Sequence, residues 1–256
     1  MPWTPNNLTT KGALASFHQA MEAGESVYEK HCQTVQSTTA TETYAFPGFQ
    51  PVPRLFKDSR QFQGARDFTF TLTNNEYELS MITSRTAWED DQTGLINARY
   101  AEMGEVWKSQ HDAIFAALLQ AGNTAAAVGY DGTQFHNSTH VTGTTGLVID
   151  NDVAFNIGTP TFMTAADVLE VVNLARYEFQ NYTDDMGRYG YNKAAIGNLR
   201  IISPPQHARG GWEAMNQVAY SSGSGATAEF GKFLAGFDVM AELSGTASEV
   251  FVSALG

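Results

Sequence analysis

The clearest hydrophobic pattern in the chain predicts one long helix over residues 94–121. Apolar residues recur there at intervals of three and four, which places them on one helical face: Ile96, Tyr100, Met103, Trp107, Ile114 and Leu118. His111 falls on the same stripe, where we expect a packed, hydrogen-bonded residue and not a ligand. Gly122 suits the end of the helix. At 1.5 Å per residue the helix is about 40 Å long, enough to serve as the backbone of a subunit.

Alternation with a period of two predicts strands in "FTFTLTNNEYELSMI", residues 68–82. Phenylalanine and leucine point one way over residues 68–73, and threonines point the other way. Asn74 and Asn75 suit a turn before a second apolar series, so we expect a long hairpin. An isolated two-stranded ribbon is marginal in water, so its apolar face needs support. That support comes either from its own domain or from a neighbouring subunit, and periodicity does not choose between them.

Shorter patterns predict further elements on both sides of these two. Leu14, Phe17 and Met21 lie on one face of a helix that ends near Gly24. A second helix, "TAADVLEVVNLARYEF", begins at the N-cap Thr164, and Asp167 completes an acidic variant of the capping box. "LRIISPP" predicts a buried strand, "QHARGGWEAMNQVAY" a short helix, and "FDVMAEL" and "EVFVSAL" two more strands. Helices and strands alternate irregularly, so the predicted fold class is α+β.

Composition and charge narrow the function classes. The chain has 256 residues, 43% of them hydrophobic, and carries a net charge of −12. That charge argues against a protein whose main task is to grip nucleic-acid phosphates. Cys32 is the single cysteine, so an intrachain disulfide and a cysteine-rich zinc site are both excluded. We find no apolar run long enough to span a bilayer and no signal peptide in "MPWTPNNLTTKG", so we expect synthesis in the cytoplasm.

The stretch "YDGTQFHNSTH", residues 130–140, holds the best candidates for chemistry. A metal-dependent hydrolase using Asp131, His136 and His140 is one interpretation. The spacing of the two histidines would suit a zinc site on a helix. However, the stretch is rich in residues that favour turns, and Asn137 stands where that motif requires glutamate. We therefore favour a structural loop in which Asp131 and Gly132 form a turn and Phe135 is the anchor. No catalytic residue, metal site or cofactor is predicted.

Several segments together resemble a known family. "TETYAFPGFQPVPRLF", "SRTAWEDDQTG", "LLQAG" and "YDGTQFHNSTH", in this order, are similar to the major head subunits of Mu-type phages and prophages. That family belongs to the tailed-phage capsid proteins of the Hong Kong 97 type. The resemblance implies an N-terminal arm over residues 1–43 and an extended β-hairpin loop over 44–88. It further implies a peripheral domain over 89–158, with the long helix as its spine, and an axial domain over 159–256 that returns toward the peripheral domain.

The resemblance also implies a function and partners. The expected activity is self-assembly into hexamers, pentamers and an icosahedral shell that encloses double-stranded DNA without sequence-specific binding. The expected partners are further copies of the chain and scaffolding, portal and decoration proteins, with no membrane. The expected location is the virion, after synthesis in the bacterial host cytoplasm. An encapsulin-like compartment shell is the alternative within the same fold. One departure from the family pattern is His136, where a second aromatic residue is common.

Charge clustering marks a candidate contact between subunits. Four of the chain's 15 lysines and arginines lie between positions 54 and 66. They are Arg54, Lys57, Arg60 and Arg66. They form either a solvated charged face or a contact with acidic groups of an adjacent subunit. The acidic candidates stand just before the long helix, where they also suit its positive end: Glu89, Asp90 and Asp91.

Overall fold

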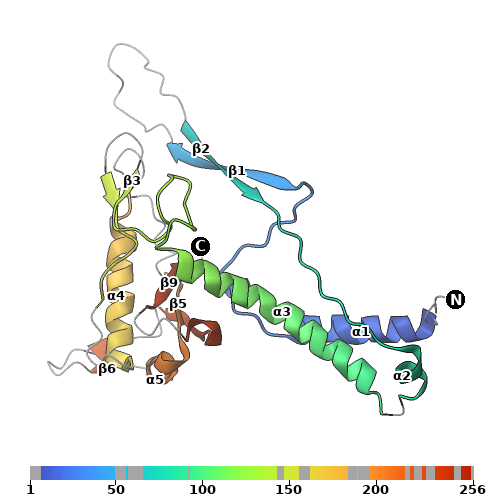
Figure 1. The fold of residues 1–256 in the computed structure, drawn as a ribbon. Coiled ribbons are helices and arrows are strands. Elements are labelled where there is room, and N and C mark those ends of the chain that lie inside the picture. The colour runs from blue at the N-terminus through green and yellow to red at the C-terminus, as the bar shows by residue number, and fades with distance from the viewer. Residues whose placement is uncertain are drawn as a thin grey trace. The chain divides into compact units, whose positions relative to one another are not determined.

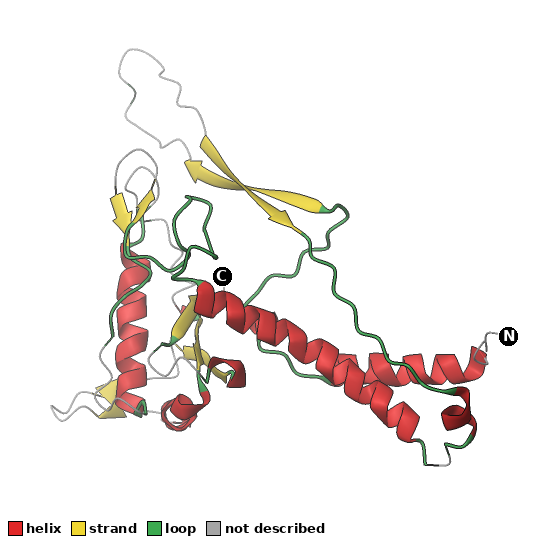
Figure 2. Cartoon of the chain, viewed as in Figure 1, coloured by secondary structure: helices red, strands yellow, loops and turns green. Residues whose placement is uncertain are grey.

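The computed structural model describes residues 7–49, 56, 66–91, 93–142, 147–155, 162–183, 189, 197–216, 220–221, 227–228, 234–244 and 249–254 (Figure 1). Several helices and four small sheets among these described residues confirm the α+β class (Figure 2). The chain divides into two compact units. One comprises Met1–Thr34 and Asn75–Ala116, and the other comprises Val35–Asn74 and Ala117–Gly256. No helix among the described residues combines the length and the apolar character needed to cross a membrane.

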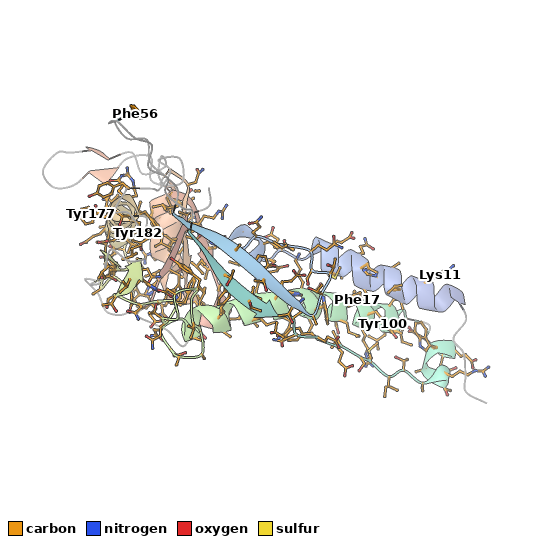
Figure 3. The ribbon with its side chains drawn as sticks, turned by 90° about the horizontal axis from the view of Figure 1, so that it is seen from above. Lys11, Phe17, Phe56, Tyr100, Tyr177 and Tyr182 are labelled. Carbon is orange, nitrogen blue, oxygen red and sulfur yellow. The ribbon has the colours of Figure 1, made fainter. Side chains whose placement is uncertain are left out.

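The first unit is built from helices that pack closely. It contains α1 (Asn7–Ala23), α2 (Arg85–Glu89), most of α3 (Leu95–Ala121) and a short 3-10 turn at Tyr28–Lys30. The bounds of α1 and α3 confirm the two predicted helices. A Cβ placed on Gly104 of α3 would lie 2.4 Å from the Phe17 carbonyl oxygen of α1. Only glycine therefore permits this approach of the two backbones, and Figure 3 labels Phe17 on α1 beside Tyr100 on α3.

A buried carboxylate ties the chain after α1 to the middle of α3. Asp112 Oδ1 accepts hydrogen bonds from the Ser26 hydroxyl, the Val27 amide and the Tyr28 amide, at 2.9 to 3.0 Å. The Tyr28 ring also stacks on His111, with ring centroids 5.4 Å apart. A buried carboxylate with several donors costs far less than an unpaired one. Asp112 therefore fixes the path of the connecting segment.

The buried face of α3 differs from the predicted stripe. Its buried residues are Ile96, Gly104, Asp112 and Ala116. Leu118 is 57% exposed, and His111 is also exposed, although its Nδ1 lies 3.1 Å from the Trp107 carbonyl oxygen. The prediction that His111 is packed in the core was wrong. Small and polar residues make this helix contact, and a search for apolar periodicity does not register them.

The second unit contains the predicted ribbon, with a different strand partner. β1 (Thr41–Phe49) pairs antiparallel with β2 (Arg66–Thr73). The expected turn at Asn74 was wrong, because residues 74–82 form no strand. Instead the Asn74 side chain donates to the Ser37 hydroxyl and to the Thr39 carbonyl, at 2.6 and 2.7 Å. Asn74 therefore closes the ends of the two strands where they leave the ribbon.

A three-stranded sheet and two helices form the main core of the second unit. β5 (Leu199–Ser203) lies between β8 (Leu234–Val239), which is parallel to it, and β9 (Phe251–Ala254), which is antiparallel. α4 (Ala165–Asn181) and α5 (Ala208–Asn216) pack on this sheet. The buried cluster includes Val168, Val172, Leu199, Ile201, Ala214 and Leu234. These elements confirm the predicted helices and the strands in "LRIISPP" and "EVFVSAL". The strand predicted for "FDVMAEL" was partly wrong, because β8 ends at Val239 and Ala241–Leu243 forms a 3-10 turn.

The start of α4 was predicted correctly from its neighbouring residues. The Thr164 side chain accepts from the Asp167 amide, and the Asp167 carboxylate accepts from the Thr164 amide, so the predicted capping box is present. Two small antiparallel pairs complete the described elements of this unit: β3 (His140–Thr142) with β4 (Leu147–Ile149), and β6 (Tyr220–Ser221) with β7 (Thr227–Ala228). Short 3-10 turns lie at Pro205–His207 and Ala241–Leu243.

We predict that Gly104→Ala destabilises the first unit by about 2 kcal/mol or more, because the new methyl group meets a backbone carbonyl that cannot move aside alone. Gly12→Ala is the matched control, since Gly12 also lies inside a helix but a Cβ there meets nothing within 4 Å. The control should gain up to about 1 kcal/mol from helix propensity. Urea unfolding of both variants measures this. Equal stability of Gly104→Ala and the natural chain would show that the helices are not in this close contact.

Candidate functional site

The stretch singled out by the sequence folds as a tight, hydrogen-bonded loop after α3. The Gly129 amide donates to the Thr133 carbonyl at 2.7 Å, and the Phe135 amide donates to the Ala127 carbonyl at 2.9 Å. Gly132 has a φ of 79°, which favours glycine, and its amide donates to the Gly129 carbonyl. The predicted turn at Asp131 and Gly132 is therefore confirmed. His140 begins the short strand β3 and so lies at the end of this loop.

Asp131 and His140 form a partly buried hydrogen-bonded pair inside the loop. Asp131 Oδ2 lies 2.6 Å from His140 Nδ1 and accepts from the Thr133 hydroxyl at 2.7 Å. The other histidine nitrogen, Nε2, lies 3.2 Å from the Phe135 carbonyl oxygen. Burial alone would raise the pKa of Asp131, but the hydrogen bonds from His140 and Thr133 outweigh it, so the pKa is lowered. The pair holds the two ends of the loop together.

This geometry does not make a catalytic triad. In a triad the acid and the nucleophile contact opposite nitrogens of the histidine. Here Thr133 Oγ1, at 2.9 Å, and Asp131 both face His140 Nδ1, while Nε2 faces a carbonyl oxygen. Burial raises the pKa of the Cys32 thiol, which disfavours the reactive thiolate. The contacts of His140 with Asp131, Thr133 and Phe135 instead hold the loop together.

The second histidine is placed apart from this pair and has a different environment. His136 lies against Gly122, since a Cβ built on that glycine would fall 2.0 Å from the ring. Its ring centroid lies 5.0 Å from that of Phe135 and 5.4 Å from that of Phe251 in β9. Phe135 itself is 53% exposed, so the prediction that Phe135 is the anchor was wrong and His136 has that role. Among the described residues, no three metal-binding side chains come together.

The acidic candidates before α3 have unequal freedom to bind another molecule. Glu89 pairs with Arg85 on the exposed surface of α2, at 2.6 Å. Asp91 accepts from the Leu95 and Ile96 amides, at 3.2 and 3.0 Å, and so caps α3. The hydrogen bond from the Ile96 amide is the main reason that the pKa of Asp91 is lowered. Asp90 is exposed, and its backbone ends α2.

The basic candidates cannot be placed against these acids. Arg54, Lys57 and Arg60 lie outside the described residues. Arg66 is the first residue of β2, and its side chain is likewise outside the description.

One face of the ribbon is apolar and is not part of the core. The register pairs Tyr44 with Phe70 and Glu42 with Leu72, and it places threonines opposite one another at the positions between. Cross-strand partners share a face, so Tyr44, Phe70 and Leu72 gather on one side of the ribbon, with Glu42 at its end. Leu72 is 47% exposed, and none of these side chains belongs to the buried cluster of the second unit. We call Tyr44, Phe70 and Leu72 the apolar ribbon face.

A groove on α3 is a second apolar surface, and sequence periodicity did not predict it. Residues expected on a strand instead lie along the helix and leave a groove of about 330 Å³ between them and α3. Its lining residues are Leu79, Met81, Arg99, Glu102, Met103 and Val106. Ile82, next to it in sequence, is fully exposed. The first unit therefore also presents apolar surface to its surroundings.

Comparisons with known proteins point to one family. The sequence model of the Mu-like prophage major head subunit gpT family matches residues 7–167. The chain is 29% identical over 124 residues to the major capsid protein of Escherichia phage Mu, which covers 48% of this chain and 40% of that protein. It is 27% identical over 128 residues to the Mu-like prophage FluMu major head subunit of Haemophilus influenzae, which covers 50% and 41%. The chain thus spans about two fifths of the length of these curated relatives.

Solved structures of phage heads are similar to parts of the chain. The procapsid of bacteriophage JBD30 is 26% identical, with a TM-score of 0.46, and the match covers 62% of this chain and 55% of that one. The bacteriophage JBD30 capsid is 27% identical, with a TM-score of 0.45, and the match covers 62% and 51%.

We predict that Asp131→Asn destabilises the second unit by about 1 to 3 kcal/mol, because the loop loses its charge-assisted hydrogen bonds. Since the pKa of Asp131 is lowered on folding, its contribution is present above about pH 4 and is lost as the pH falls through the folded value. Thermal melting at neutral and acidic pH measures both effects. Glu242→Gln, at an exposed carboxylate, is the control and should change little. A variant with unchanged melting at neutral pH would contradict the structural role.

Proposed function

The chain belongs to the Mu-like prophage major head subunit gpT family, and on that premise we propose that it is a major capsid subunit whose activity is self-assembly into a closed shell around double-stranded DNA. The observation that carries the proposal is the family match over residues 7–167, more than half of the chain. The net charge of −12 suits a wall that confines DNA without binding it tightly. The role is structural and not enzymatic.

The proposed organisation is that of the Hong Kong 97 type. Residues 1–43 are the N-terminal arm, 44–88 the extended loop, 89–158 the peripheral domain and 159–256 the axial domain. The long helix α3 suits a spine, and the ribbon β1–β2 suits an extended loop. The virion is the proposed location, after synthesis in the bacterial host cytoplasm. Scaffolding, portal and decoration proteins are the proposed partners beside further copies of the chain.

We place one proposed contact between copies at the apolar ribbon face. Tyr44, Phe70 and Leu72 lie on a two-stranded ribbon that cannot cover them itself. The groove lined by Leu79 and Met103 offers an apolar surface of suitable character on another copy. A contact between two different surfaces of the same chain can repeat around a ring, which is how a capsomer closes.

A second proposed contact is electrostatic. Arg54, Lys57 and Arg60 are proposed to meet the acidic residues before α3 of an adjacent subunit. Of those acids, Asp90 is the best candidate, because Asp91 caps α3 and Glu89 already pairs with Arg85. Single exposed ion pairs contribute only about 0 to 1 kcal/mol each. Repetition at every copy of the contact lets such small energies decide whether a shell closes.

Removing the apolar ribbon face should weaken assembly strongly and leave the subunit folded. The test variant is Phe70→Thr with Leu72→Thr, which keeps strand-forming residues. Each lost side chain removes about 1.5 to 3 kcal/mol of burial, so the concentration needed for assembly should rise at least about tenfold. The control, Thr69→Ser with Thr71→Ser, changes the opposite face and should assemble normally. Electron microscopy and light scattering report shells, and circular dichroism reports folding; normal shells from the test variant would remove the ribbon from the interface.

Reversing the basic cluster should also stop shell closure, but with a different salt response. We predict that Arg54→Glu, Lys57→Glu and Arg60→Glu together give a folded subunit without complete shells, and that assembly of the natural chain weakens as salt rises. The control reverses three exposed cations elsewhere, Lys11, Lys30 and Arg209, at the same cost in net charge. Equal loss of assembly in both triple variants would assign the effect to net charge and not to a specific contact. Shells that contain protein in place of DNA would support an encapsulin-like compartment.

A further inference from the structure

His136 joins three segments that are distant in the sequence. Its imidazole lies on Gly122, at the end of α3, where any side chain would collide with the ring. The same ring packs against Phe135 in the loop and against Phe251 in β9. The ring therefore occupies the place of an aromatic side chain, with one difference. An imidazole can take up a proton, and a phenyl ring cannot.

The contacts of His136 suit only its neutral form. Its Nε2 atom is buried and has no hydrogen-bond partner. In the neutral ring this nitrogen can be an acceptor that carries no proton, and an unpaired acceptor between aromatic rings costs little compared with an unpaired charge. In the protonated ring the same atom becomes a buried donor on a cation. Protonation therefore destabilises the packed position of the His136 ring.

His140, at the other end of the same loop, has a hydrogen-bond partner at each of its ring nitrogens. The Thr133 hydroxyl donates to Asp131, so His140 Nδ1 is the group that donates to the Asp131 carboxylate. His140 Nε2 faces the Phe135 carbonyl oxygen, which can only accept. These hydrogen bonds hold the two ends of the loop together without any contribution from His136.

We propose that residues 122–142 form a pH-responsive clasp between the end of α3 and strand β9, and that protonation of His136 opens it. The clasp stays closed while the His136 ring is neutral. When the ring gains a proton, it leaves the contact with Gly122 and Phe251, and β9 loses its attachment to the loop. The pair of Asp131 with His140 keeps the loop itself folded, so the change is local. This proposal concerns the single chain and does not depend on assembly.

The charges around His136 are consistent with this direction. Burial lowers the pKa of His136 below its ordinary value, which outweighs the opposing attraction of Asp152 and Glu249 and a hydrogen bond to the Leu119 carbonyl; the nearby His140 lowers it further. Because the pKa is lower in the closed clasp than in the open one, the open form binds more protons. Stability of the clasp is therefore full above about pH 6.5 and decreases as the pH falls, by up to about tenfold in the opening equilibrium per pH unit.

Hydrogen exchange measured by mass spectrometry tests the clasp. Peptides from residues 122–142 and 249–254 of the purified chain are compared at about pH 7.5 and about pH 5.5, within the range where histidine titrates. After correction for the intrinsic effect of pH on exchange, the natural chain should lose protection severalfold in both segments at the lower pH. His136→Phe keeps an aromatic ring on Gly122 and should show no such loss. His111→Phe, which alters a histidine stacked on Tyr28, should respond like the natural chain.

Two results would overturn the proposal. One is equal loss of protection in the natural chain and in His136→Phe, and the other is no change in the natural chain. If His136→Phe does not fold, nuclear magnetic resonance of the histidine rings in the natural chain decides the question. A His136 ring that titrates below the exposed histidines, together with a shift of the Phe251 signals at the same midpoint, supports the clasp. Titration of His136 at the ordinary value refutes it.

Discussion

A two-stranded ribbon cannot bury its own apolar face, and this constraint governs the rest of the molecule. Tyr44, Phe70 and Leu72 share one side of β1 and β2, and threonines share the other. Each strand satisfies half of its backbone groups in the other strand, but the side chains have no second layer within the buried cluster. Burial of that face against another surface would be favourable at about 25 cal/mol per Å². The ribbon alone does not gain the free energy of burying this face, so that free energy is available for association.

Local signals predicted the elements well, whereas long-range pairing escaped them. The capping box of Thr164 and Asp167 and the bounds of α3 follow from neighbours three and four residues apart, which a sequence displays directly. The strand that pairs with β2 cannot be identified from such neighbours, because residues 50–65 separate β1 from β2 in the sequence. The apolar alternation just after Asn74 is nearer to β2 and looked equally suitable as its partner. The buried face of α3 was also not predicted. Gly104 is buried because the backbone of α1 approaches it closely, and Asp112 is buried because it accepts hydrogen bonds.

In the loop of residues 130–140, too, the sequence predicted the local structure but not the contacts with distant residues. Its density of glycine, asparagine, serine and threonine correctly predicted a turn and argued against a helical zinc site. It could not predict that His140 pairs with Asp131 while His136 packs against Gly122 and Phe251. Two identical residues four positions apart acquire different environments, because one meets hydrogen-bond partners and the other meets aromatic rings. Such differences arise only from contacts across the fold.

Large apolar side chains are exposed on both units, in addition to the apolar cluster that is buried in the second unit. An apolar cluster holds the inside of the second unit, and in the first unit Asp112 holds the segment after α1. Apolar side chains face outward on both units, with Leu118 half exposed and Ile82 fully exposed. Large exposed apolar surfaces on a folded chain indicate contact with other molecules. The segment after α1 is held by polar contacts such as those of Asp112, while large apolar side chains on both units stay exposed.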